Sequence, residues 1–138
     1  MRVALLISGG GTTAEQIILA CRSGRLEGVT LALVVSSRAD AHGISRVHAA
    51  GVPKSDILVL EPNSFASRDA FGEAIISECR KRDVDFIGQY GWLAKTPSNV
   101  IEAFKGMMVN QHPGPLDPGR LDFGGRGMFG RRVHCARL

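Results

Sequence analysis

The chain has 138 residues, of which 44% are hydrophobic and 22% charged, and its formal net charge is +4. This length and composition fit one globular domain with its own core, and they exclude a disordered chain or a scaffold that needs disulfides. Residues 1–119 carry 12 Lys and Arg against 12 Asp and Glu, whereas residues 120–138 carry five Arg and one Asp, so a neutral body argues against a surface built for nucleic acid.

Apolar runs and helical periods alternate along the chain. Residues 3–7 form a short apolar run before three glycines, and residues 12–22 have the spacing of an amphipathic helix with Thr12 and Glu15 as a capping box. Further strands are predicted at 29–35, 57–60, 84–90 and 107–110, and further helices at 41–50, 67–82 and 97–104, the last capped by Thr96. Strands without strict alternation, separated by helices, indicate βαβ units. The expected fold class is therefore α/β: a doubly wound, mostly parallel, Rossmann-like sheet.

The character of the sequence changes after residue 112. Seven of the 17 glycines fall between residues 106 and 130, together with Pro113, Pro115 and Pro118. We therefore predict an α/β domain over residues 1–112, and over residues 113–138 a loop rich in Gly, Pro and Arg that leads into the start of a helix and is incomplete.

No apolar run approaches the roughly 18 residues of a membrane span. The first eight residues read as a strand and not as a signal peptide. The three cysteines, Cys21, Cys79 and Cys135, are far apart and lack the spacing of a metal site. We expect reduced core thiols, no metal, no membrane attachment and a cytoplasmic location.

Glycines and hydroxyls follow the first strand. In an open parallel sheet, ligands bind beyond the carboxyl ends of the strands. Gly10, Gly11, Thr12 and Thr13 place backbone N–H groups and hydroxyls at a helix start, which predicts a phosphate cradle. A tight strand-to-helix turn would need no ligand to explain it. A weak match to the dinucleotide fingerprint, with Arg38 after the second strand, keeps an NADP-type binding module as an alternative.

A second polar pair ends the fifth predicted strand. Asn110 and His112 stand two residues apart, so both side chains point to one face. A carboxamide donor beside an imidazole suits an acyl-transfer site, where both stabilise an oxyanion and the His moves a proton. A third group follows the fourth strand, where Trp92 either lines a pocket for a flat ring or is a core aromatic, and its position after a strand favours the pocket.

The order of these segments resembles the glycinamide ribonucleotide formyltransferases. The resemblance lies in Val-Ala-Leu-Leu-Ile-Ser-Gly-Gly-Gly-Thr-Thr at 3–13, Ser-Ser-Arg-Ala-Asp-Ala-His-Gly at 36–43, Ser-Arg-Asp-Ala-Phe at 67–71 and Asn-Gln-His-Pro at 110–113. It covers residues 1 to about 118 and continues more loosely to the end. Departures from the family pattern include Thr12-Thr13 in place of Ser-Asn and Trp92-Leu93 in place of a Met-Arg pair.

The resemblance implies transfer of a formyl group from 10-formyltetrahydrofolate to the amine of glycinamide ribonucleotide, a step of purine biosynthesis. The residues around Gly11 would hold the substrate phosphate, and Asn110 and His112 would stabilise the tetrahedral intermediate. The folate pteridine would be bordered by Gln89, Tyr90, Gly91, Trp92 and Leu93. The partners would be these two small molecules, with no nucleic acid, and a homodimer is left open.

The family's third catalytic residue, an Asp that lies well beyond the His, has no match among the 26 residues that follow His112. We therefore expect the N-terminal half of such an enzyme, inactive or nearly so alone. The alternatives are another folate-dependent formyltransferase, a formyltetrahydrofolate hydrolase, or the non-catalytic nucleotide-binding module.

Overall fold

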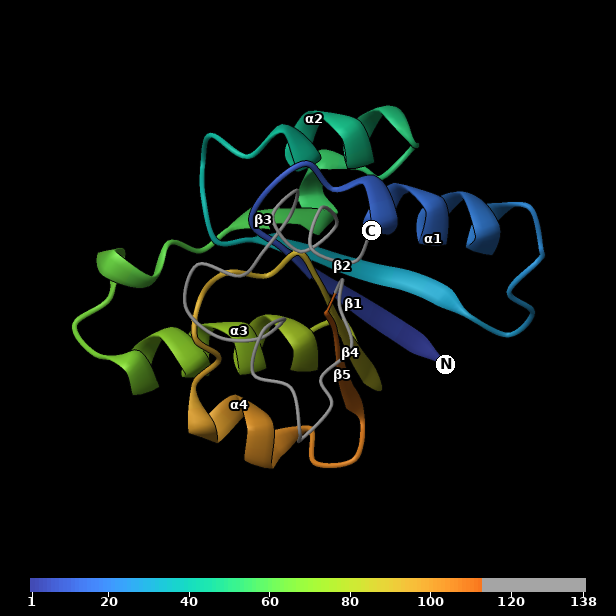
Figure 1. Cartoon of the computed structure of the whole chain (residues 1–138). Coiled ribbons are helices and arrows are strands. Elements are labelled where there is room, and N and C mark those ends of the chain that lie inside the picture. The colour runs from blue at the N-terminus through green and yellow to red at the C-terminus, as the bar shows by residue number, and fades with distance from the viewer. Residues whose placement is uncertain (113–138) are drawn as a thin grey trace, which may run out of the picture.

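A computed structural model describes residues 1–112, which form a five-stranded parallel sheet between two helical layers (Figure 1). The strands are β1 (Arg2–Ile7), β2 (Thr30–Ser36), β3 (Ile57–Val59), β4 (Phe86–Tyr90) and β5 (Met108–Gln111). The α-helices are α1 (Thr12–Arg22), α2 (His42–Ala49), α3 (Arg68–Arg80) and α4 (Ser98–Ala103), and the short 3-10 turns are η1 (Lys54–Asp56) and η2 (Pro62–Ser64). The predicted α/β class is confirmed.

The strand order is β3-β2-β1-β4-β5, and each neighbouring pair is parallel. The chain winds outward from β1 to β3, then returns through α3 to β4 on the other side of β1. The boundary between β1 and β4 is therefore the topological switch point, where doubly wound folds bind their ligands. Helices α1 and α2 cover one face of the sheet, and α3 and α4 cover the other (Figure 1).

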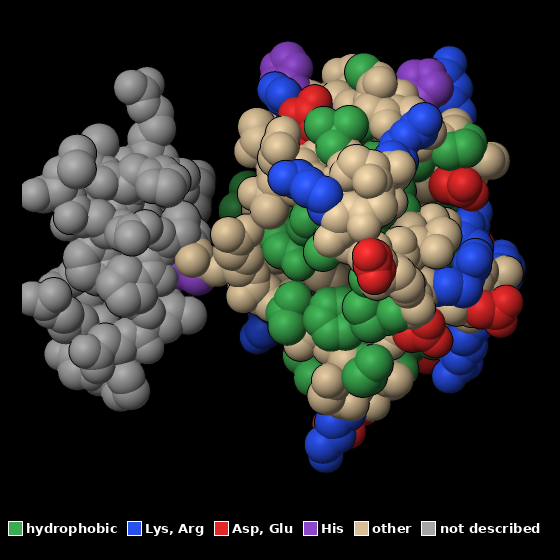
Figure 2. Space-filling view, turned by 90° about the vertical axis from the view of Figure 1, so that its right-hand side faces the viewer, with side chains coloured by type: hydrophobic (Ala, Val, Ile, Leu, Met, Phe, Trp, Pro, Cys, Tyr) green, Lys and Arg blue, Asp and Glu red, His purple; other side chains and the backbone are tan. Residues whose placement is uncertain are grey.

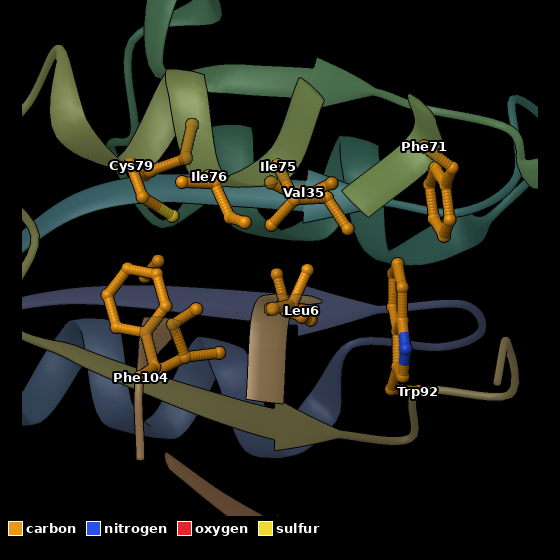
Figure 3. Close-up of a cluster of buried hydrophobic side chains, with 12 residues drawn as sticks. Leu6, Val35, Phe71, Ile75, Ile76, Cys79, Trp92 and Phe104 are labelled. Atoms are coloured by element: carbon orange, nitrogen blue, oxygen red, sulfur yellow. The ribbon is translucent and has the colours of Figure 1, made fainter. Parts of the chain in front are cut away.

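Two hydrophobic clusters fill the layers. The cluster under α3 and α4 includes Leu6 of β1, Val35 of β2 and Phe71 of α3 (Figure 3). The cluster under α1 and α2 includes Leu5 of β1 and Val47 of α2. Neighbouring residues of β1 thus enter opposite layers, which explains its unbroken apolar sequence.

Helix α1 begins and ends as predicted, but its cap is different. The expected capping box of Thr12 and Glu15 is wrong, because Gly11 in the left-handed region (φ 68°) is the N-cap and no side chain caps the helix. Thr12 is already the first helical residue, so it cannot accept a hydrogen bond from the next turn as an N-cap would.

The N-terminal caps of α3 and α4 differ from each other. Ser67 caps α3 and accepts a hydrogen bond from the Ala70 N–H. Thr96 does not cap α4, whose N-cap is Pro97. The Thr96 hydroxyl instead accepts a hydrogen bond from the Gln89 side chain, 2.7 Å away. The predicted strand and helix bounds otherwise agree with the structure to within two residues.

Ion pairs gather around Arg82 at the edge where the strands begin. Its guanidinium lies 2.6 Å from Glu78 and 3.7 Å from Asp56, and it donates to the Ser55 carbonyl. Its own carbonyl accepts from the Arg2 side chain. Arg82 thus joins α3, the turn before β3 and the first residue of β1. Figure 2 shows this end of the molecule, where hydrophobic side chains gather centrally and charges of both signs surround them.

Within residues 1–112, no helix is long and apolar enough to cross a membrane. The same residues contain no group of three His, Cys, Asp or Glu side chains that could hold a metal ion. Cys79 is a buried free thiol, and burial raises its pKa to about 12. Cys21 is a half-buried free thiol. Cys135 and the predicted segment 113–138 lie outside the described residues.

Replacing Glu78 by Gln removes a pH-dependent stabilisation. Hydrogen bonds from Lys81 and then Arg82 hold the pKa of Glu78 below its usual 4.5. A carboxylate with a lowered folded-state pKa stabilises the fold fully above its ordinary pKa, and this contribution is lost as the pH falls through the lowered value. Urea unfolding of both proteins should show wild type more stable at pH 7, with the difference closing below about pH 4.5.

The exposed Glu102 of α4 provides the control, since Glu102→Gln should change stability little. A gap between wild type and Glu78→Gln that stays constant from pH 7 to pH 3 would contradict the assigned ion pairs.

Candidate active site

The polar groups predicted from the sequence lie at the carboxyl edge of the sheet. The glycine loop follows β1, residues 91–97 follow β4, and His112 follows β5. Because β4 lies between β1 and β5, the ends of β1 and β5 are separated by two strand spacings, about 10 Å. One small molecule can therefore span this distance along the edge.

The glycine loop presents the start of α1. Gly10 and Thr12 are exposed, and Gly11 and Thr13 are half-buried. The first N–H groups of an α-helix have no acceptor within the helix, and the helix dipole makes this end attractive to anions. Since no side chain caps α1, these donors face the loop and stay available to a ligand. The geometry is that of an anion cradle.

Helix α2 braces this loop. The Gly43 N–H donates to the Gly9 carbonyl at 2.8 Å, and a Cβ on Gly11 would lie only 2.6 Å from the Gly43 Cα. The Arg46 guanidinium donates to the Gly10 carbonyl at 2.8 Å and pairs with Glu15 at 3.1 Å. The sequence analysis assigned no role to Gly43 or Arg46. The signal that could have pointed to Gly43 is a glycine within the first turn of a predicted helix.

Strands β4 and β5 bring Gln89 beside Asn110. The two residues are register partners, and both line an open hollow of about 350 Å³ between β5 and α4. Gln89 is buried and donates to Thr96, whereas Asn110 is exposed. His112 follows β5 directly and is half-buried. Their roles in catalysis stay predictions, and their placement at one strand end is as expected.

The segment 89–93 divides between three environments. Gln89 faces α4, and Tyr90 packs against the cluster on the opposite face, where burial raises its pKa. Gly91 and Leu93 are exposed. Trp92 is 8% exposed and stacks on Phe71, with ring centroids 6.3 Å apart and planes 9° apart (Figure 3). The structure therefore places Trp92 as a core aromatic, the alternative considered above, and its contact with folate stays a prediction.

A second hollow at the same edge involves residues that sequence reasoning did not assign to the site. It has a volume of about 400 Å³, and its wall includes Arg68, Lys95 and the rings of Phe65 and Phe71. These residues come from the start of α3 and from the loops after β3 and β4. No local pattern predicts such a group, because two segments distant in sequence, residues 62–71 and the loop after β4, assemble it. Two cations and the partly exposed Phe65 in one hollow suit an anion attached to a flat, apolar body.

The fold and this edge define a doubly wound α/β protein whose polar groups meet at the switch point. Comparison with known proteins gives the family. A family model described as formyl transferase matches residues 1–118. The chain belongs to the formyl transferase family.

The relatives with this fold and sequence are mostly longer. The chloroplastic phosphoribosylglycinamide formyltransferase of Arabidopsis thaliana is 30% identical over 99% of this chain and 44% of its own length. The Escherichia coli K12 enzyme of the same name is 30% identical over 84% of this chain and 53% of its own. The chain thus spans about half the length of these curated relatives.

Solved structures agree with this family. Glycinamide ribonucleotide transformylase 1 from Geobacillus kaustophilus superposes with a TM-score of 0.81 at 30% identity, over 97% of this chain and 67% of that one. The protein of the same name from Symbiobacterium toebii gives 0.80 at 34% identity, over 91% of this chain and 56% of that one.

The glycine loop makes a direct prediction about stability. Gly11→Ala introduces a side chain at φ 68° and drives its Cβ against the Gly43 backbone, so it should lower the free energy of unfolding by about 2 kcal/mol. Gly10→Ala is the matched control, because no atom lies within 4 Å of its Cβ position. Urea unfolding measures both variants, and equal midpoints for the two would refute the contact between Gly11 and Gly43.

Proposed function

We propose that this chain carries the phosphate-binding and oxyanion-stabilising parts of a phosphoribosylglycinamide formyltransferase. The reaction transfers the formyl group of 10-formyltetrahydrofolate to the amine of glycinamide ribonucleotide in purine biosynthesis. One observation carries the proposal: the anion cradle at α1 and the pair Asn110 and His112 share one sheet edge, two strands apart. A phosphorylated ribose with a short amine arm would bridge them.

The phosphate would bind at the start of α1. The N–H groups of its first turn would donate to the phosphate oxygens, together with the hydroxyls of Thr12 and Thr13. The brace from Gly43 and Arg46 supports this role, because it fixes the loop backbone before any ligand arrives. A preorganised cradle loses less conformational entropy on binding.

The chemistry would take place beside Asn110 and His112. The substrate amine attacks the formyl carbon, the carbonyl π bond opens, and negative charge develops on the formyl oxygen. The Asn110 amide and the His112 imidazole would donate hydrogen bonds to that oxygen. The carbonyl then re-forms as the bond to the folate nitrogen breaks, and the proton lost by the amine would pass through His112 to that nitrogen.

The hollow lined by Arg68 and Lys95 supports a folate as formyl donor. Folates carry a flat ring system and, at the far end, carboxylates. Two cations and the partly exposed phenyl ring of Phe65 at the same edge match those features in chemical type. The residues proposed to bind the two substrates do not require a metal ion.

The NADP-type module has less support from the geometry. Arg38, its best candidate for a 2′-phosphate, is paired with Asp40 at 2.7 Å. The neighbouring hydroxyls are engaged as well: Ser36 donates to the Arg38 carbonyl, and Ser37 shares a hydrogen bond with Ser8. Assays of formyl transfer to different acceptors distinguish glycinamide ribonucleotide from other amines and from water. The zero net charge of residues 1–119 argues against a nucleic acid as acceptor.

The proposal also covers the partners, the location and the oligomeric state of the protein. Its partners are the two small-molecule substrates and no nucleic acid, its location is the cytoplasm, and sedimentation velocity decides between a monomer and a homodimer. The free thiols Cys21 and Cys79 are consistent with a reducing compartment.

Binding of glycinamide ribonucleotide tests the cradle. Calorimetry with this chain should detect the ribonucleotide, and the dephosphorylated riboside should bind at least about tenfold more weakly, since charge-assisted hydrogen bonds to phosphate contribute about 1.5–3 kcal/mol. NADPH serves as the competitor. Binding of NADPH but not of the ribonucleotide would overturn the proposal.

His112→Ala tests the reaction separately from binding. We expect the variant to bind the ribonucleotide as wild type does. Formyl transfer, measured in an active polypeptide that contains residues 1–138, should fall by about 10²- to 10⁴-fold. Transfer is followed by the absorbance of the folate product. Loss of ribonucleotide binding in this variant would show that His112 is structural.

A further inference from the structure

Ser8 lies where three strand ends meet. It follows β1 directly, precedes the glycine loop and is 3% exposed. Its hydroxyl lies 2.6 Å from the hydroxyl of Ser37, the residue that follows β2. Its neighbours after β4 are Gly91 and Leu93, on either side of Trp92. One small buried side chain thus contacts the ends of both strands that flank β1.

Ser8 holds the segment after β4 through two hydrogen bonds. The Ser8 N–H donates to the Gly91 carbonyl at 3.1 Å, and the Leu93 N–H donates to the Ser8 hydroxyl oxygen at 2.8 Å. These two bonds, which we call the Ser8 bridge, fix the backbone on both sides of Trp92. Gly91 adopts φ 70°, a left-handed turn that lets the chain return toward Ser8.

Trp92 needs such fixation. Its ring stacks on Phe71, but its indole N–H is buried and finds no hydrogen-bond acceptor among residues 1–112. A buried donor without an acceptor costs free energy, so packing and the backbone must hold the ring in place. The packing comes from Phe71, and the backbone constraint comes from the Ser8 bridge.

We propose that Ser8 is a positioning residue that couples the glycine loop to the segment 91–93 through the Ser8 bridge. A ligand that binds to the braced loop after Ser8 thereby adds restraint to the backbone around Trp92. Since the loop is proposed to bind the phosphate substrate and residues 89–93 to border the folate, this coupling rests on the proposed function. Its consequence is that the first substrate to bind prepares the site for the second.

The sequence offers a built-in probe, because Trp92 is the only tryptophan of the chain. Tryptophan fluorescence therefore reports on the surroundings of Trp92 alone. In Ser8→Ala, acrylamide quenching of Trp92 should rise at least twofold under conditions where the protein stays folded. Ser37→Ala removes the hydroxyl pair but keeps both bonds of the bridge, so its quenching should stay close to wild type.

Val47→Ala controls for general destabilisation. Val47 is fully buried on the opposite face of the sheet, away from Trp92. This variant should lower the urea midpoint without changing Trp92 quenching. A folded Ser8→Ala protein with wild-type quenching would overturn the proposal.

A measurement on the wild type decides the bridge even if Ser8→Ala does not fold. Leu93 is an exposed residue outside any helix or strand, and the acceptor of its amide is the Ser8 hydroxyl. Hydrogen exchange should therefore show a protected Leu93 amide. Exchange at the rate of an unstructured peptide would refute the bridge.

A measurement with bound ligand tests the coupling between the glycine loop and residues 91–93. Saturating glycinamide ribonucleotide should lower Trp92 quenching in wild type and leave it unchanged in Ser8→Ala. Binding seen by calorimetry without any change at Trp92 in wild type would overturn the coupling and leave the proposed function standing. Absence of ribonucleotide binding would instead refute the proposed function, while quenching and exchange without ligand still decide the bridge.

Discussion

Burial of β1 on both faces is the interaction on which the rest of the structure depends. Every residue from Val3 to Ser8 is at most 4% exposed. Leu5, Leu6 and Ile7 alone contribute on the order of 6 kcal/mol of apolar burial, comparable to the net stability of an ordinary domain. This burial orders β2 and β4 on either side of β1, and it determines where the chain must leave the sheet. The glycine loop and the Ser8 bridge both begin at that point.

Where the carboxyl edge meets α1, backbone groups predominate over side chains. Gly11 and Gly43 approach each other so closely that neither tolerates a Cβ, and the loop between β1 and α1 is consequently held by main-chain contacts. Donors fixed in this way can bind an anion without first becoming ordered. The proposed side-chain chemistry adds to these backbone donors, most of all at the far end of the edge, where Asn110 and His112 stand.

Much of this arrangement could be predicted from the sequence, because it follows from local patterns. The bounds of α1 and the spacing of Asn110 and His112 depend on neighbouring residues, and the repeated alternation of strands and helices indicates the parallel sheet. The failures come from contacts distant in sequence. Thr12 does not cap α1 because Gly11, which packs against Gly43 of another helix, takes the N-cap position, and Thr96 is instead bound by Gln89 of β4. Trp92 enters the core because Phe71 offers a parallel ring, and Arg68 and Lys95 line one hollow only once two distant segments have folded together.

The cluster around Arg82 has a consequence for how such a chain can change. Arg82 joins α3, the turn before β3 and the first residue of β1, all at the edge opposite the proposed substrates. Substitutions at this cluster therefore change stability at the end of the strands that is remote from the proposed ligand contacts. The reverse does not hold, because the glycine loop at the carboxyl edge carries both tight packing and proposed ligand contacts, so a new specificity at that loop brings a change in stability with it.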